Sequence, residues 1–408
     1  MVDTLIERIR AAHETGAPLI IQGGGSKSFY GNADEGEVLS TRGLAGVVDY
    51  QPKELVLTAR AGTPLADIET LLAEHGQMLA FEPPHYGEFP LAGRSANAPA
   101  GVNSAASPPL PNPLPHAGEG ANDALRAPKP IHATLGGAIA AGLSGPRRPY
   151  AGAARDFVLG VRMIDGTGQP LRFGGQVIKN VAGYDVSRLM VGALGTLGVL
   201  TEVSLKVLPQ PAEEISLQFE LDEATAIRRM NEWAGQPLPL SASSWHAGVL
   251  TLRLSGAASA VRAAQTKLGG EGLKDAAGFW QRLRDQATPF FDKRPLWRLA
   301  VRPTLGPLKL GDAQWIEWGG AVRWLATDLP AAALREAARS CGGHATLFRG
   351  EPPPQPSPRT GEGANVMPQP IDGVFAPLPP PLLALHRALK ARFDPRGILN
   401  RGRLYPDF

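Results

Sequence analysis

The spacing of apolar and polar residues predicts two helices and several short strands in the first part of the chain. Four apolar residues lie at the spacing of one helical face: Leu5, Ile6, Ile9 and Ala12. Gly16 and Pro18 end this first helix. Short apolar runs predict four strands, at residues 19–21, 38–40, 47–50 and 55–59. Pro64 then opens a second helix, and Gly76 ends it.

The same alternation of apolar runs continues along the rest of the chain. Residues 155–164 and 199–207 are predicted to be further strands of the first, α+β part. After Pro211 new strands are predicted at residues 215–220, 249–254, 297–301, 321–325 and 345–348. Helices are predicted between them at residues 223–233, 258–268 and 331–340. Beyond Pro380 one more amphipathic helix precedes the end of the chain.

These elements fall into two α+β regions, in agreement with a length of 408 residues, which is too long for one ordinary core. We expect a first domain at residues 1–211 and a second at residues 212–375. A separate C-terminal tail is expected at residues 376–408.

Two segments interrupt this pattern, at about residues 90–130 and 351–370, where proline, glycine, alanine and serine dominate. Residues 109–122 match residues 352–365 at nine of fourteen positions, including four alternating prolines and a shared Gly-Glu-Gly-Ala-Asn. Our hypothesis is that both are low-complexity insertions in surface loops, where a longer loop adds little closure entropy. The alternative is a pair of proline-rich motifs that bind a partner.

Composition excludes several classes of protein. Apolar residues make up 43% of the chain and charged residues 19%, which is typical of a globular enzyme. The net charge of +3 is scattered without a basic run, so nucleic-acid binding is not expected. Cys341 is the only cysteine, which rules out a disulfide framework and a cysteine-ligated cluster within this chain and favours a reducing compartment. Neither a signal peptide nor an apolar run long enough to span a membrane is present, so we predict a cytoplasmic location with any membrane attachment through partners.

The most informative stretch is Gly23-Gly24-Gly25, which follows the predicted strand at residues 19–21. Glycines allow a tight turn and a close approach of the backbone to a ligand. Consecutive N–H groups in such a turn form a concave anion site, to which Ser26, Lys27 and Ser28 would add hydroxyl groups and a positive charge. The stretch therefore suggests a phosphate cradle, with a plain tight turn as the alternative.

Further glycines follow in residues 133–142 and at Gly192, Gly195 and Gly198. Their spacing differs from the Gly-x-Gly-x-x-Gly of a Rossmann turn, and no Walker Gly-Lys occurs in the sequence. Neither of these common nucleotide folds is therefore predicted.

Taken together, residues 20–28, 133–142, 155–166, 173–189 and 192–201, with the tail at Asn400, resemble the FAD-binding domain of the vanillyl-alcohol-oxidase (PCMH) superfamily. Residues 81–84, 142–150 and 179–185 resemble most closely the FAD-binding E subunits of bacterial glycolate oxidase. The likeness covers most of residues 1–211 and the tail, and residues 90–130 depart from it as an insertion would.

The resemblance implies a fold and a set of binding residues. The fold is α+β, with a PCMH-type FAD-binding domain of two α/β subdomains, completed by the C-terminal tail, and a smaller α+β cap with an antiparallel sheet. The implied FAD-binding residues are Gln22, Gly23, Gly24, Gly25, Ser26, Lys27, Ser28, Thr134, Gly136, Gly137, Gly142, Gly195, Thr196, Leu197, Gly198, Val199 and Asn400. The first seven would hold the pyrophosphate, and Asn400 would close over the flavin.

The resemblance also implies non-covalent FAD, because Ser26 stands where the superfamily's attachment histidine would be and Cys341 lies in the other domain. The paired-histidine pattern of the related hydroxy-acid dehydrogenases is missing, so no metal site and no catalytic residue is assigned. Four basic residues could attract a carboxylate or a flavin phosphate: Arg147, Arg148, Arg155 and Lys179. For Arg147 and Arg148 we expect solvation at the surface instead.

By resemblance the chain is one subunit of a glycolate oxidase (dehydrogenase) complex that oxidises glycolate, a small 2-hydroxy acid, to glyoxylate. The implied partners are a larger FAD-binding subunit and an iron–sulfur subunit that passes electrons to the respiratory chain. Two alternatives remain open. One is a self-sufficient FAD-dependent oxidase of another 2-hydroxy acid or alcohol, and the other is a non-catalytic assembly subunit.

Overall fold

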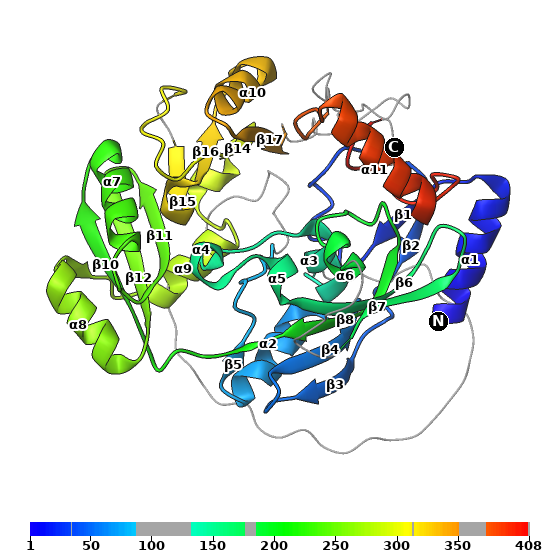
Figure 1. Cartoon of the computed structure of the whole chain (residues 1–408), viewed down its shortest axis with the longest axis horizontal. Coiled ribbons are helices and arrows are strands. Elements are labelled where there is room, and N and C mark those ends of the chain that lie inside the picture. Colours follow the sequence, from blue (N-terminus) through cyan, green and yellow to red (C-terminus); the bar gives the residue numbers. More distant parts are fainter. Residues whose placement is uncertain (34, 87–131, 176–184, 312–313, 351–372, 407–408) are drawn as a thin grey trace, which may run out of the picture.

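The computed structural model describes residues 1–33, 35–86, 132–175, 185–311, 314–350 and 373–406. Two sheets organise the chain, a five-stranded one and an eight-stranded one, each with its own helices (Figure 1). The predicted insertions at about residues 90–130 and 351–370, and residues 179–184 of the motif that resembles glycolate oxidase subunits, lie outside the described residues.

The N-terminal unit consists of one helix and a two-stranded parallel sheet. Its elements are α1 (Val2–Thr15), β1 (Leu19–Gln22) and β2 (Glu37–Ser40). The predicted apolar face of α1 is buried at Leu5, Ile9 and Ala12. It packs in one cluster with Leu19 and with Leu399 from the other end of the chain. This packing fixes the orientation of β1 and hence the position of the glycine run that follows it.

The five-stranded sheet is antiparallel throughout and has the strand order β3-β4-β8-β6-β7. Its strands are β3 (Val47–Gln51), β4 (Val56–Arg60), β6 (Val158–Ile164), β7 (Pro170–Gly174) and β8 (Val199–Lys206). Helices α2 (Leu65–Glu74) and α3 (Leu135–Ala141) share its core through Leu65, Ile68, Leu135 and Ile139, all of which are fully buried. Three short helices, α4 (Arg148–Ala151), α5 (Ala154–Phe157) and α6 (Val186–Leu189), and the small pair β5 (Gln77–Met78) and β9 (Leu208–Pro209) complete this half.

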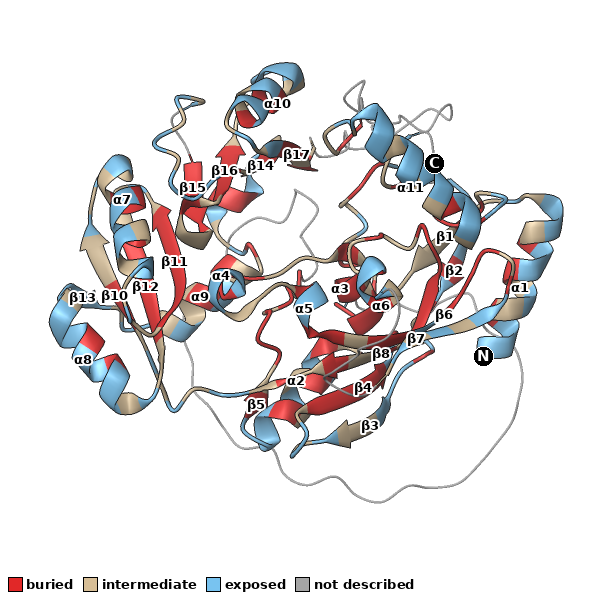
Figure 2. Cartoon of the chain, viewed as in Figure 1, coloured by how far each residue is buried: buried red, intermediate tan, exposed pale blue. Residues whose placement is uncertain are grey.

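The eight-stranded sheet is also antiparallel, with the order β13-β10-β12-β11-β15-β16-β14-β17. Its strands are β10 (Glu213–Glu220), β11 (Leu240–His246), β12 (Val249–Gly256), β13 (Glu271–Gly272), β14 (Leu296–Ala300), β15 (Gln314–Glu317), β16 (Val322–Ala326) and β17 (His344–Arg349). Its helices are α7 (Glu223–Ala234), α8 (Ala258–Leu268), α9 (Ala276–Arg284), η1 (Pro289–Asp292), η2 (Trp318–Gly320) and α10 (Ala331–Ser340). Figure 2 shows that α7, α8 and α10 each carry an exposed side, while strands β11, β12 and β16 are largely buried.

The C-terminal tail forms α11 (Pro380–Phe393) and then returns to the N-terminal unit. Leu399 makes a parallel bridge with Leu19, and its carbonyl accepts a hydrogen bond from the buried ammonium group of Lys390 at 2.7 Å. The same ammonium group pairs with Asp394 at 2.8 Å and donates to the carbonyl of Thr196 at 2.8 Å. The return of the tail, expected from the resemblance, is therefore present.

An ion-pair network built on two buried arginines joins the two halves. Arg147, which precedes α4, contacts Glu82 at 3.4 Å and Glu214 of β10 at 2.6 Å. Arg253 of β12 contacts Glu82 at 2.8 Å. The expectation that Arg147 lies solvated at the surface is wrong, because its side chain is 9% exposed and its charge is used between the two halves. These contacts hold the eight-stranded sheet against the motif at residues 81–84.

Several element predictions need correction. The strand expected at residues 155–164 begins only at Val158, because residues 154–157 form the helical turn α5, in which the side chain of Asp156 accepts a hydrogen bond from the Ala153 N–H. Strands β7, β11 and β15 and helix α9 were not predicted. Strand β11 was missed because its buried positions include three serines, which hide the apolar pattern of a strand.

Candidate functional site

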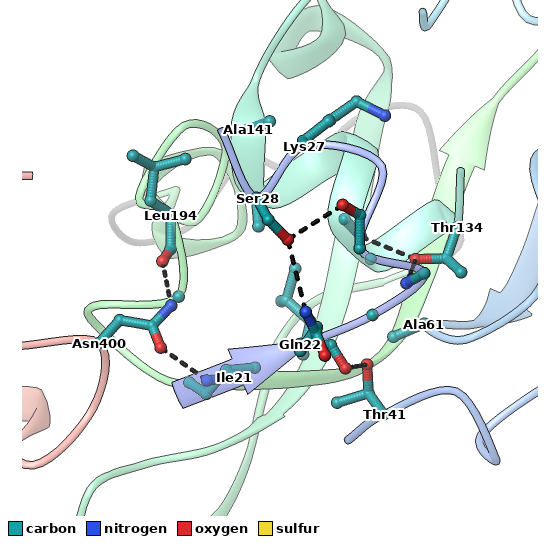
Figure 3. Close-up of a pocket in the computed structure, with 18 of the residues that line it drawn as sticks. Ile21, Gln22, Lys27, Ser28, Thr41, Ala61, Thr134, Ala141, Leu194 and Asn400 are labelled. Carbon is teal, nitrogen blue, oxygen red and sulfur yellow. Dashed lines mark hydrogen bonds between the residues drawn. The ribbon is translucent and has the colours of Figure 1, made fainter. Parts of the chain in front are cut away.

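A cavity opens where the glycine run after β1, the start of α3 and residues 193–198 meet (Figure 3). These three segments are far apart in the sequence, and each supplies glycines or small residues to the wall. Residues that the sequence predicted to bind FAD make up half of the lining: Gln22, Gly23, Gly24, Gly25, Ser26, Lys27, Ser28, Thr134, Gly136, Gly137, Gly195, Gly198 and Asn400.

The glycine run packs directly on the strand-like segment before α3. Gly25 forms a parallel bridge with His132, and the backbone N–H of Gly24 lies 3.4 Å from the hydroxyl of Thr134. A Cβ atom at residue 24 would lie 1.5 Å from the carbonyl oxygen of His132, so no larger residue fits there. Gly25 itself has a φ of 83°, in the left-handed region that glycine adopts without strain.

Two arginines hold the carbonyl groups of this loop. Arg42 donates to the carbonyl of Gly23 at 3.0 Å and to that of Gly24 at 2.6 Å. Arg403, from the C-terminal tail, donates to the carbonyls of Ser28 at 2.6 Å and Tyr30 at 2.8 Å. Because a peptide unit is planar and trans, the N–H of Gly25 points away from the Gly24 carbonyl and hence away from Arg42. Neither arginine was singled out from the sequence.

Thr134 connects the loop to α3. As the N-cap residue of that helix, it accepts a hydrogen bond from the backbone N–H of Gly137 at 3.4 Å while its hydroxyl also faces Gly24. Gly136 approaches Ala61 so closely that an added Cβ would lie 2.7 Å from the Ala61 methyl group. Because Gly136 has no side chain, the start of α3 can lie close to Ala61, just after β4. The glycines of α3 also add no side chain that would fill the cavity.

Asn400 joins the other two walls. Its side-chain oxygen accepts a hydrogen bond from the Ile21 N–H at 2.6 Å, and its amide group donates to the Leu194 carbonyl at 2.6 Å (Figure 3). The residue is buried and has a φ of 42°, which asparagine tolerates better than most residues. Its amide thus aligns β1 with the turn at Gly195.

Lys27 is the cation of the predicted cradle. Its ammonium group lies 3.3 Å from the Ser26 hydroxyl and 5.5 Å from the centroid of the Tyr86 ring. Burial lowers the pKa of Lys27 to about 8; the negative charge of Asp285 opposes this shift, and the positive charge of Arg284 adds to it. A bound anion would replace the lost hydration and favour the charged form.

Four predicted residues lie elsewhere. Gly142 lines a second, neighbouring cavity instead. Thr196, Leu197 and Val199 are buried and do not line the first cavity. The Thr196 hydroxyl donates to the Ala193 carbonyl at 2.7 Å, so it is engaged within its own turn. No sequence pattern pointed to other residues of the lining, among them Tyr30, Thr41, Ala61, Met190, Leu194 and Arg403.

The donor set of the first cavity fits a diphosphate-bearing cofactor. Among the described residues that line it, none is acidic, and two carry a positive charge, Lys27 and Arg403. The close approach of Gly24 to His132 leaves backbone rather than side chain at the wall. Among the described residues, no group of three or more His, Cys, Asp or Glu side chains is arranged to hold a metal ion. Over the same residues, every helix is too short or too polar to cross a membrane.

Sequence comparison relates the chain to flavoproteins. A family model described as an FAD binding domain matches residues 1–107. The chain is 42% identical to the glycolate oxidase subunit GlcE of Escherichia coli (strain K12), over 99% of this chain and 97% of that protein. It is also 42% identical to the glycolate oxidase subunit GlcD of Bacillus subtilis (strain 168), over 84 residues that make up 21% of this chain and 18% of GlcD. A D-lactate dehydrogenase of Archaeoglobus fulgidus is 27% identical over 204 residues, 50% of this chain and 36% of that enzyme.

Structural comparison agrees with this relationship at the level of the fold. Two solved structures of alkyldihydroxyacetonephosphate synthase match with TM-scores of 0.59 and 0.53. Each is 15% identical and covers 98% of this chain and 74% of its own. Together with the family model, they confirm the predicted fold class, an α+β FAD-binding domain accompanied by an α+β cap.

Proposed function

Because this chain belongs to the family of the glycolate oxidase subunit GlcE, we propose that it is the FAD-binding subunit of a complex that oxidises glycolate to glyoxylate. Its cofactor is FAD, and its family is one of FAD-dependent oxidoreductases. The similarities to GlcD and to a D-lactate dehydrogenase make the oxidation of 2-hydroxy acids the chemistry of the family.

One observation carries the assignment of the cofactor site. Three glycine-bearing segments that are distant in sequence meet at one cavity, where Lys27 and Arg403 supply positive charge and no described lining residue supplies a negative one. When bound, FAD supplies a two-electron acceptor for the oxidation of an alcohol carbon. The chain's own contribution is to present backbone N–H groups to the diphosphate, fix the loop carbonyls on Arg42 and Arg403, and align the walls through Asn400.

The thirteen predicted residues that line the cavity are the proposed FAD-binding residues. The flavin is held without a covalent bond. Ser26 stands at the position of attachment, and Cys341 follows α10 in the other half of the chain. Residues 1–211 and 376–408 form the flavin domain, and residues 212–375 form the cap.

The partners we propose are a larger FAD-binding subunit and an iron–sulfur subunit. Two facts support a multi-subunit enzyme: the relatives GlcE and GlcD are both named as subunits, and one cysteine cannot ligate a cluster. The complex works in the cytoplasm, and its contact with the inner membrane comes through the partner subunits.

The test is to purify the full chain alone and together with both partners and to record the flavin absorbance of each sample. We expect a yellow protein whose flavin is released into the supernatant by acid, and bleaching by glycolate only when the partners are present. A protein that stays colourless and takes up no added FAD would overturn the proposal. Bleaching of the isolated chain by glycolate would instead identify a self-sufficient oxidase.

A further inference from the structure

A second cavity of about 410 Å³ lies between the two halves of the chain. Residues 141–148 of the flavin half form one wall, and strands β14, β16 and β17 contribute to the other. Tyr30 and Ala141 line both this cavity and the proposed FAD cavity, so the two are neighbours. A ligand in the second cavity would lie beside the cofactor site.

Two guanidinium groups from opposite walls meet on one indole ring. The Arg148 guanidinium carbon is 4.4 Å from the centroid of the Trp318 ring, and that of Arg298 is 4.9 Å from it. Arginine stacks well on tryptophan, because its flat cation is attracted to the face of the ring. Arg148 is exposed at the rim, whereas Arg298 is half-buried on β14.

Trp318 is held in place as a platform for these side chains. Its indole N–H donates to the Gly145 carbonyl at 3.2 Å, which ties the cap to the flavin half. Its φ of 56° lies in the left-handed region, which is rare and costly for an aromatic residue. Backbone strain of this kind is retained mainly where function requires a particular geometry.

In the described part of the chain, Arg148 and Arg298 stand without a hydrogen-bonded ionic partner. Neither guanidinium group has an ion pair or a side-chain hydrogen bond with any described residue. Neighbouring cations differ: Arg147 is paired with Glu82 and Glu214, and Arg284, which lines the same cavity, is paired with Asp285 at 2.8 Å. Burial, followed by the repulsion of Arg298, lowers the pKa of Arg148. An anion between them would relieve this repulsion.

Glu317 is the one acidic side chain among the described residues that line the cavity. The positive charge of Arg148 and Arg298 is therefore largely uncompensated. The carboxyl group is buried, and one of its oxygens accepts a hydrogen bond from the Trp324 indole N–H at 2.7 Å. Burial raises the pKa of Glu317 to about 7, so a large share of the group is uncharged at neutral pH.

From this arrangement we infer that the second cavity binds the carboxylate of a small organic acid, with Arg148 and Arg298 as its binding pair on the Trp318 platform. Guanidinium groups form charge-assisted hydrogen bonds to carboxylates in a planar geometry. The assignment of this acid as a 2-hydroxy acid or its 2-oxo product rests on the proposed function. The carboxylate chemistry rests on the cavity alone. Both arginines are positioning and specificity residues for that ligand.

The test measures binding of oxamate to the full-length, FAD-loaded chain by isothermal titration calorimetry. Oxamate carries one carboxylate and cannot be oxidised as an alcohol, and neutral oxamide serves as the size-matched control. We expect oxamate to bind and oxamide not to bind. Arg148→Gln and Arg298→Lys should each weaken oxamate binding about tenfold or more, because each removes a charge-assisted contact or its planar geometry.

Arg262→Gln is the matched control, because this arginine is 72% exposed and does not line the cavity. It should change oxamate affinity less than about twofold. The inference is overturned if wild-type chain does not bind oxamate, or if binding survives unchanged in both cavity variants. The flavin-to-protein absorbance ratio and the melting temperature of each variant report cofactor loading and folding separately. A chain that binds oxamate but not FAD would therefore refute the proposed function and leave the carboxylate site standing.

Discussion

The side-chain oxygen of Asn400 accepts a hydrogen bond from the backbone N–H of Ile21 at 2.6 Å, although 379 residues separate the two in the sequence. The same side chain donates to the carbonyl of Leu194 at 2.6 Å. One amide therefore sets the distance between β1, which carries the glycine run, and the turn at Gly195. The polar atoms of Asn400 thus join two walls of the cavity, which the residue also lines.

Replacing Asn400 by alanine should lower both stability and FAD affinity. The substitution leaves the Ile21 N–H and the Leu194 carbonyl without their partner, which costs about 1–3 kcal/mol when such groups are buried. Thermal unfolding and FAD titration measure the two effects. Asn400→Gly is the control, because glycine accepts the φ of 42° and its comparison with alanine separates backbone strain from the lost hydrogen bonds. Unchanged FAD affinity in both variants would contradict the assigned role.

Gly24→Ala should abolish FAD loading. Its added Cβ would lie 1.5 Å from the His132 carbonyl oxygen, so the loop must move away from the start of α3. Overpacking of this kind costs about 1–3 kcal/mol or more, and the displaced N–H groups no longer face the diphosphate. The flavin-to-protein absorbance ratio after purification measures the loss. Gly306→Ala is the control, since a Cβ there meets no atom within 4 Å, and it should load FAD normally. Full FAD loading of Gly24→Ala would contradict the proposed phosphate cradle.

Arg253→Met should loosen the junction between the two halves. Arg253 is 3% exposed and pairs with Glu82, while Glu214 lies 3.9 Å away. Removing this buried cation leaves the partly buried Glu82 carboxylate with Arg147 as its remaining partner, and we expect a loss of about 1–3 kcal/mol in the free energy of unfolding. Arg262→Met on α8 is the matched control, because its pair with Glu213 involves a side chain that is 72% exposed and should contribute little. Urea unfolding of both variants distinguishes the two, and equal losses would argue against a buried network.

Much of the fold could be predicted because apolar periodicity is local. Helix α1 and strands β1, β4 and β8 follow directly from the positions of Leu5, Leu19, Leu57 and Val203, all of which are buried. Strand β11 could not be predicted in this way. Its buried Ser243 accepts a hydrogen bond from the Gly319 N–H at 2.9 Å. Because this partner is distant in the sequence, the local apolar pattern cannot predict that Ser243 is buried.

The two candidate sites also differ in how far the sequence predicts them. Glycines mark the FAD cavity in the sequence, because only glycine allows the close approach at residue 24. Arg298 and Trp318 have no such signal in the sequence, since an arginine on a strand is ordinary until folding places it on an indole ring from another segment. Arg148 was named as a residue that could attract a carboxylate, but solvation at the surface was the expected role. Its position beside Arg298 is a property of the tertiary structure.

Glu317 should make stability depend on pH. Its pKa in the folded protein is raised to about 7 from an ordinary value of 4.5, chiefly by burial. The folded state therefore binds a proton more tightly than the unfolded state, so stability is fully present below about pH 4.5 and is lost as pH rises to about 7. With each pKa unit worth about 1.4 kcal/mol, the loss amounts to up to about 3 kcal/mol.

Glu317→Gln tests this dependence with little change in shape. Glutamine keeps an oxygen that can accept the hydrogen bond from the Trp324 indole N–H but cannot ionise. The free energy of unfolding of the variant, minus that of the wild type, should be near zero below about pH 4.5 and should grow to its maximum above about pH 7. Denaturant titrations at a series of pH values measure this difference, in which titrations common to both proteins cancel. A difference that is flat across the series would show that the carboxyl group is stabilised as an anion by Arg298 and that burial is not the dominant influence.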